Sequence, residues 1–161
     1  SYPSNLPVTS ETNNVNVGLN TAMSVGMLSS DQTKTGFLAR GVTVTTGTGS
    51  KLFGSLDFDY RNDFNETTGV YTAPVTGLYF ISVSGTSTNA GNLIIHINVD
   101  GSDITTSVSP NATSASVTSS IHYRLNKGST VTLRQSGGEF YSTNVAYSAF
   151  SVQLVTQTGV P

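Results

Sequence analysis

The chain of 161 residues contains no cysteine and no tryptophan, and only 10% of its residues are charged. Without cysteine there is no disulfide bond, thiolate metal site or cysteine nucleophile. Seven basic and nine acidic residues give a net charge of −2, so the chain lacks the excess of basic residues that is typical of proteins that bind nucleic acid. No apolar run approaches the roughly 20 residues of a membrane-spanning helix, so we expect no membrane insertion.

The residues that replace the missing charges are short and polar, with 23 Ser, 24 Thr and 13 Asn. This composition favours an extracellular protein, or one on the surface of a cell or virion. The hydrophobic content of 36% is enough to build a core.

Helical periodicity is nearly absent, while β-branched residues dominate and turn residues recur about every ten positions. Polar and apolar residues alternate in segments 56–61, 92–99, 120–125 and 130–134. The alternation predicts strands with one buried and one solvated face. Nine or ten such strands between Phe37 and Thr156 indicate an all-β sandwich or jelly roll. Residues 1–35 lack the pattern and are predicted to be an N-terminal arm or linker before a domain at 36–161.

From Gly36 onward, the predicted strands carry short sequence motifs in the same order as in a known protein family. Segment 36–40 reads GFLAR, segment 56–59 reads LDFD, and segment 63–80 reads DFNETTGVYTAPVTGLYF. Near the end, Leu125 and Gly128 precede the strand TVTL, and an aromatic-rich strand begins at Tyr147. In these features the chain resembles the C1q-like branch of the C1q and tumour-necrosis-factor superfamily. The resemblance implies a ten-strand antiparallel jelly-roll sandwich that assembles as a homotrimer.

Adjacent aromatic residues on one strand point to opposite faces, so at least one of them is expected to leave the core. Tyr79 and Phe80 form such a pair, and Tyr147 and Phe150 are also separated by an odd number of positions. An aromatic side chain on the outer face of a sheet favours a subunit contact. The candidates for the trimer interface are Phe37, Tyr79, Phe80, Tyr147 and Phe150.

No catalytic motif is found. The segment that comes nearest to a nucleophile elbow, 22–26, lacks its first glycine. His96 and His122 are placed on the polar sides of their strands, where solvated or interface histidines are expected, and no third ligand has metal-binding spacing. We therefore expect no enzymatic activity and no cofactor.

Three carboxylates are candidates for calcium binding. Asp57 and Asp59 share one predicted strand face, and Asp63 follows in the next loop. The spacing does not match a calcium loop, and a solvated face is the favoured interpretation.

Strands of an antiparallel jelly roll alternate in direction, so successive loops alternate between its two ends. In the family that the chain resembles both termini lie at the base, so the loops Thr86–Asn92, Ser109–Ser114 and Ser136–Asn144 are expected together at the apex. Amide and carboxylate acceptors beside aromatic rings suit a sugar ligand. The ligand-binding candidates are Asn89, Asn92, Asn111, Glu139, Tyr141 and Asn144.

Together these features predict a trimeric recognition module that binds glycans or a cell-surface protein. The alternative is a structural or receptor-binding trimerisation domain of a virion, a spore coat or the extracellular matrix. A hydrolase is a third and distant alternative.

Overall fold

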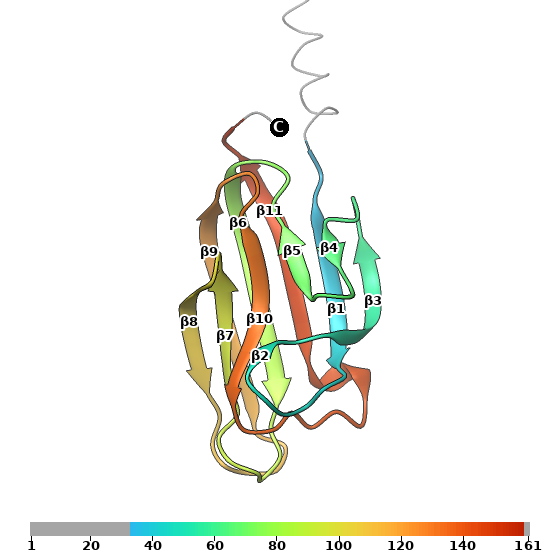
Figure 1. The fold of residues 1–161 in the computed structure, drawn as a ribbon, viewed down its shortest axis with the longest axis vertical. Helices are drawn as coiled ribbons and strands as arrows, with labels where there is room; N and C mark the ends of the chain where they lie inside the picture. The colour runs from blue at the N-terminus through green and yellow to red at the C-terminus, as the bar shows by residue number, and fades with distance from the viewer. Residues whose placement is uncertain (1–32, 160–161) are drawn as a thin grey trace, which may run out of the picture. The chain divides into compact units, whose positions relative to one another are not determined.

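The computed structural model describes residues 33–159, and the arm predicted for residues 1–35 lies almost entirely outside them. The described chain consists of two antiparallel sheets packed face to face, as Figure 1 shows. It contains eleven strands, one more than the expected ten, because a two-residue strand, β2, pairs with β10. The predicted jelly-roll sandwich is confirmed. No helix of the described residues is long and apolar enough to cross a membrane.

The strands divide between the sheets as follows. The five-stranded sheet has the order β3 (Phe53–Asp59), β1 (Gly36–Val42), β11 (Ala149–Gln157), β6 (Gly77–Thr86) and β9 (Ser116–Leu125). The other sheet has the order β4 (Phe64–Asn65), β5 (Val70–Thr72), β10 (Thr130–Gly137), β7 (Ile94–Val99) and β8 (Ser102–Val108), with β2 (Gly49–Ser50) beside β10.

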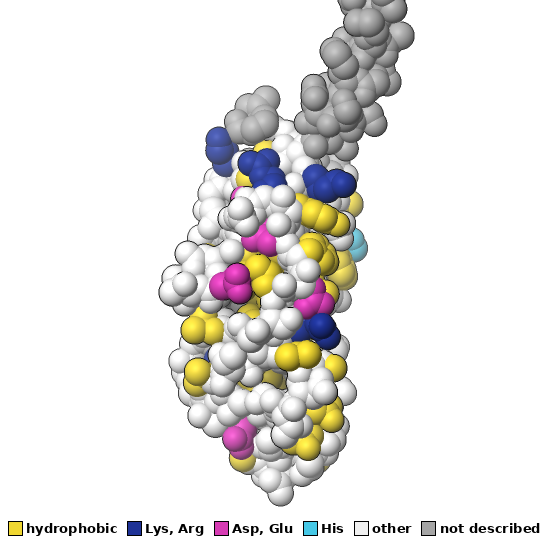
Figure 2. Space-filling view, turned by 90° about the vertical axis from the view of Figure 1, so that its right-hand side faces the viewer, with side chains coloured by type: hydrophobic (Ala, Val, Ile, Leu, Met, Phe, Trp, Pro, Cys, Tyr) yellow, Lys and Arg dark blue, Asp and Glu magenta, His cyan; other side chains and the backbone are white. Residues whose placement is uncertain are grey.

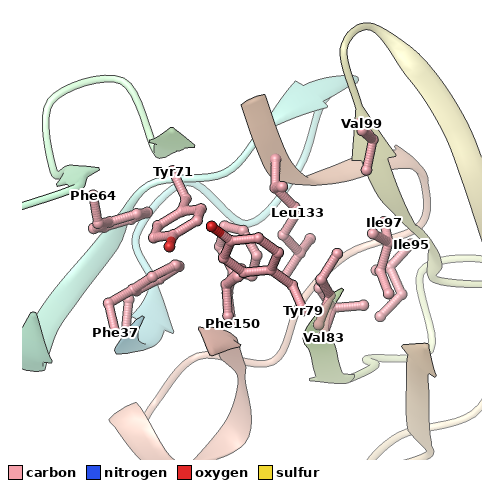
Figure 3. Packing of buried hydrophobic residues seen from close by; sticks show 14 of the residues in the cluster. Phe37, Phe64, Tyr71, Tyr79, Val83, Ile95, Ile97, Val99, Leu133 and Phe150 are labelled. Carbon is pink, nitrogen blue, oxygen red and sulfur yellow. The ribbon is translucent and has the colours of Figure 1, made fainter. Parts of the chain in front are cut away.

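Alternating side chains from both sheets fill the space between them. Tyr79, Ile81 and Val83 of β6 are fully buried, and so are Ile95 and Ile97 of β7. Figure 3 shows Val83 of β6 close to Ile95 and Ile97 of β7. The 2-residue period in the sequence therefore marks the core correctly for these two strands.

One half of the core is aromatic. The Phe37 ring stacks on Phe64 at 4.1 Å and on Tyr71 at 5.3 Å, and the Phe150 ring meets Phe37 edge-on at 4.9 Å. Figure 3 shows these rings beside Tyr79. Stacked and edge-to-face rings contribute about 0.5–1.5 kcal/mol per pair beyond the area they bury. Phe37, Tyr79 and Phe150 are at most 1% exposed, so these three expected interface residues instead belong to the core.

Two of the core tyrosines keep their hydroxyl groups bonded. Tyr79 donates to the Val75 carbonyl at 2.6 Å. The Thr35 hydroxyl donates to Asp63 at 2.7 Å, so the Tyr71 hydroxyl donates to Thr35, at 2.5 Å. Burial raises the pKa of both tyrosines above the usual value, because the phenolate would lose its hydration.

The raised pKa of Tyr71 and Tyr79 predicts alkaline unfolding. A tyrosine that stays protonated when folded but ionises when unfolded contributes stability that is complete below about pH 10 and falls as the pH rises. We expect the free energy of unfolding to fall above pH 10, with Tyr71 contributing about 1.4 kcal/mol per pH unit. Urea titrations between pH 9 and pH 12 measure the slope. Tyr71→Phe should reduce it. An unchanged slope in Tyr71→Phe would show that Tyr71 does not govern the alkaline transition.

Strand β3 differs from the expected pattern. Leu38 pairs with Phe58 whereas Ala39 pairs with Leu56, so Asp57 is an extra residue that forms a β-bulge. The bulge reverses the alternation beyond it. Leu56 remains against the core, but Phe58 is 41% exposed on the outer face. Tyr60, just beyond the strand, is 51% exposed, so the expectation that all three share one buried face is wrong for two of them.

A buried lysine organises the loop between β1 and β2. The Lys51 ammonium donates to the carbonyls of Val44, Thr46 and Gly47 at 2.9, 3.1 and 3.4 Å. The side-chain amide of the buried Gln135 donates to the Thr45 carbonyl in the same loop at 3.0 Å. Burial lowers the pKa of Lys51, because the charged form loses hydration. Neither residue was identified from the sequence, because single polar positions carry no periodic signal.

Candidate functional site

The loops that connect β6 to β7, β8 to β9 and β10 to β11 meet at one end of the sandwich (the lower end in Figure 1). Backbone hydrogen bonds join them: Ser114 donates to Ser87 at 2.8 Å, and Tyr141 donates to Thr86 at 2.7 Å. We call these three loops, residues 87–93, 109–115 and 138–148, the apex. The opposite end, the base, carries the turns at Asp100 and Asn126, so the topological expectation is confirmed.

Most of the expected ligand-binding amides hold the apex loops in place. Asn89 is exposed, whereas the other three form hydrogen bonds within the apex. The Asn92 amide donates to the Ser109 carbonyl at 2.7 Å, the Asn111 side chain accepts from Gly91 at 3.0 Å, and the Asn144 side chain accepts from Ala146 at 2.8 Å. Because these atoms already have partners, the three amides contribute mainly to the shape of the apex.

Glu139 and Tyr141 flank Phe140, which is buried. Because neighbouring residues of an extended segment alternate in direction, Glu139 and Tyr141 both project outward. One carboxylate oxygen of Glu139 accepts from the Thr88 hydroxyl at 3.1 Å, which ties two of the apex loops together. The structure thus places the only carboxylate and a phenol of the apex near each other on its surface.

The ring of Tyr141 stacks on that of Tyr147, with 4.9 Å between the centroids and 25° between the planes. Tyr147 lies in the short 3-10 helix η2 (Val145–Tyr147), whose N-cap is Asn144, and not in the last strand as expected. It is 36% exposed, and Val145 beside it is also exposed. Tyr147 therefore belongs to the apex. An asparagine before a short apolar run is a helix N-cap signal that sequence reasoning could have used.

The outer face of the five-stranded sheet carries a second group of exposed rings. Phe80 of β6 and His122 of β9 are cross-strand partners with their ring centroids 4.9 Å apart. Phe58 and Tyr60 at the β3 side are 5.0 Å apart. Figure 2 shows the β3 side of the molecule, where exposed hydrophobic side chains lie between charged ones. Of the expected interface residues, Phe80 alone lies on this outer face.

The three candidate calcium ligands do not converge. Asp57 pairs with Arg40 at 2.9 Å on the outer face. Asp59, beyond the bulge, accepts backbone N–H groups of the following loop, among them Phe64 at 3.0 Å. Asp63 accepts from Thr35. Between residues 33 and 159 there is no group of three or more His, Asp or Glu side chains positioned to hold a metal ion.

His96 was expected on a solvated face, but it is only 6% exposed. Its Nε2 lies 2.7 Å from the Ser136 hydroxyl and its Nδ1 lies 2.9 Å from the Thr106 hydroxyl. Asp103 is 3.5 Å from Nδ1 and is engaged by Arg134 at 2.6 Å. Ser136, His96 and Asp103 thus lie in the order of a hydrolase triad. However, the nearest partner of Nδ1, the atom that a triad aspartate would contact, is the Thr106 hydroxyl. This favours a structural role for His96 in joining β7, β8 and β10.

The family model of the C1q domain matches residues 20–155, so this chain belongs to the C1q domain family. Among solved structures it is similar to the globular domain of the zebrafish complement 1qA protein, with a TM-score of 0.64, 20% identity, and coverage of 78% of this chain and 100% of that chain. It is also similar to murine APRIL at pH 5.0, with a TM-score of 0.63, 10% identity, and coverage of 76% and 100%. At such identities these neighbours show the fold. The comparison with curated proteins returned no match.

Domains of the C1q and tumour-necrosis-factor type are typically extracellular trimeric modules for recognition or signalling, and they are generally not enzymes. The family match confirms the resemblance to C1q domains that the sequence analysis found.

Proposed function

We propose that this protein is a non-enzymatic homotrimeric recognition module, extracellular or surface-displayed, whose apex binds glycans. Membership of the family supports the module and its assembly. The exposed Phe80 ring on the outer face of the five-stranded sheet supports an interface there. Asp57, Asp59 and Asp63 are already engaged by protein groups, so the proposal includes no bound calcium.

The stacked pair of Tyr141 and Tyr147 is the observation that carries the proposed ligand class. A sugar presents C–H groups on the face of its ring, which pack on aromatic rings, and hydroxyl groups at its edge, which need acceptors. The Glu139 carboxylate supplies an acceptor two residues from Tyr141. The exposed Asn89 amide is a further polar group of the same apex.

Glycan binding is tested with the purified trimer on a glycan array, followed by titration of the strongest glycan. We expect Tyr141→Ala, Tyr147→Ala and Glu139→Ala each to weaken binding about fivefold or more, which corresponds to about 1 kcal/mol. Lys127→Ala, in an exposed turn at the base, is the control and should bind like the wild type. Light scattering should give the same mass for every variant.

Two results would contradict the glycan proposal. If all three apex variants bind like the wild type, the ligand lies elsewhere. If the wild-type trimer binds no glycan on the array, the ligand class is wrong, and a domain whose role is trimerisation itself in a virion, spore coat or matrix becomes the favoured function.

A further inference from the structure

The apex contains a single charged side chain. In the three apex loops, which the structure describes in full, only Glu139 carries a charge. Basic residues of neighbouring segments are already engaged, since Arg40 and Arg134 each pair with an aspartate and loop carbonyls bind the ammonium of the buried Lys51. Between residues 33 and 159, no basic side chain forms an ion pair with Glu139. The apex therefore presents a negative charge that no protein group neutralises.

Glu139 is held in place through one carboxylate oxygen and offers the other. The first oxygen accepts from the Thr88 hydroxyl at 3.1 Å, and the second accepts no hydrogen bond from the described residues. Glu139 is half-buried, so water and salt screen its charge less than they would at an exposed position. A hydrogen bond from an ammonium to a carboxylate is also roughly twice as strong as one between neutral groups. The second oxygen therefore favours an ammonium over a hydroxyl as its partner.

The stacked rings of Tyr141 and Tyr147 favour the same partner. The face of an aromatic ring is negative and attracts a cation within about 6 Å of its centre. Tyr147 is 36% exposed, and Tyr141 beside it is half-buried. A ligand that packs on these rings while it reaches Glu139 binds more tightly if it is positively charged. A ligand with a carboxylate or sulfate group is repelled by Glu139 and meets no basic residue in the described apex loops.

We propose that the glycans bound at the apex carry a free amino group, so that the ligands are amino sugars rather than acidic or neutral sugars. This inference rests on the proposed glycan binding and specifies its ligand class. The C–H face of the sugar ring packs on the tyrosine pair, and the ammonium donates to the second oxygen of Glu139. Glu139 thus determines the specificity, whereas the two rings contribute binding energy that every sugar shares.

Two trisaccharides that differ only in the amino group test this proposal: the β-1,4-linked trisaccharide of glucosamine, and the same compound with its amines acetylated. In calorimetric titrations at pH 6, where a sugar amine is protonated, the wild type should bind the amine form about fivefold to tenfold more tightly. The ratio of the two affinities should fall as the salt concentration is raised, because the added attraction is electrostatic. A trisaccharide of galacturonate should bind more weakly than either.

Two glutamate variants locate the origin of the preference. Glu139→Gln removes the charge but keeps an acceptor for the Thr88 hydroxyl, and it should lower the ratio of the two affinities to about one. Glu66→Gln is the matched control, because it removes the same charge from an exposed residue in the turn between β4 and β5. The ratio in the control variant should equal that of the wild type.

The outcomes separate the amine preference from glycan binding itself. If the acetylated or the galacturonate compound binds as tightly as the amine form, or if neither glucosamine compound binds while other glycans on the array do, the ligand class is wrong and the proposed glycan binding stands. If Glu139→Gln retains the preference, or Glu66→Gln loses it, Glu139 does not select the ligand and the proposal is again wrong. If no glycan on the array binds, the proposed function fails, and this inference fails with it.

Discussion

Replacement of Phe80 by Asp is expected to convert the trimer to a monomer. The wild type should give about 50 kDa by light scattering at micromolar concentration, three times the 16.8 kDa of one chain, and the variant should give the mass of one chain. Each interface would enclose a carboxylate that loses its hydration when the neighbouring subunit covers it. An unpaired buried charge costs several kcal/mol, and the trimer would bear this cost three times.

The control for this experiment is Val108→Asp, which adds the same charge at an exposed apolar residue of the six-stranded sheet. This variant should remain a trimer. Circular dichroism should show the same strand content in both variants, since neither side chain is part of the core. If Phe80→Asp is still a trimer, the subunits meet through another surface. If Val108→Asp dissociates as well, the loss is not specific to the five-stranded sheet.

The sequence predicted the core where the alternation of side chains runs without interruption. Ile95 and Ile97 are buried as their positions required, and Tyr79 and Phe80 face opposite ways. The pattern failed at Asp57, because a β-bulge adds one residue and reverses every side chain that follows. A bulge has no signal in a single sequence, so Phe58 could not be recognised as a surface residue.

For the candidate site, topology was predictable and side-chain contacts were not. Alternating strand directions were enough to bring the apex loops together. The stacking of Tyr147 on Tyr141 depends on the short helix η2, which replaces the expected start of the last strand. The burial of His96 depends on hydroxyl groups of Thr106 and Ser136, which belong to two other strands. Contacts of this kind between distant segments follow from the fold and cannot be inferred from local patterns.

Gly138 holds the apex loops at close range, and its replacement by alanine is expected to destabilise the protein strongly. Its φ of +75° is one that side chains other than glycine rarely adopt. A Cβ atom there would lie 2.4 Å from the Asn92 carbonyl oxygen and 2.5 Å from the Leu93 Cα. Both atoms belong to the backbone, so the loop that carries them must move.

Gly101 provides a matched control at the base, because its φ of +86° is similar but a Cβ atom there meets nothing within 4 Å. Gly101→Ala should cost about 1–2 kcal/mol for the backbone conformation alone. Gly138→Ala should cost about 1–3 kcal/mol more, because the clash adds to the same strain. Urea denaturation at one fixed protein concentration measures both, since the stability of a trimer depends on concentration. The displaced loop also carries Asn89, so Gly138→Ala should weaken ligand binding while Gly101→Ala should not. Equal losses of stability in the two variants would mean that backbone conformation alone sets the cost and that the packing of Gly138 against Asn92 does not shape the apex.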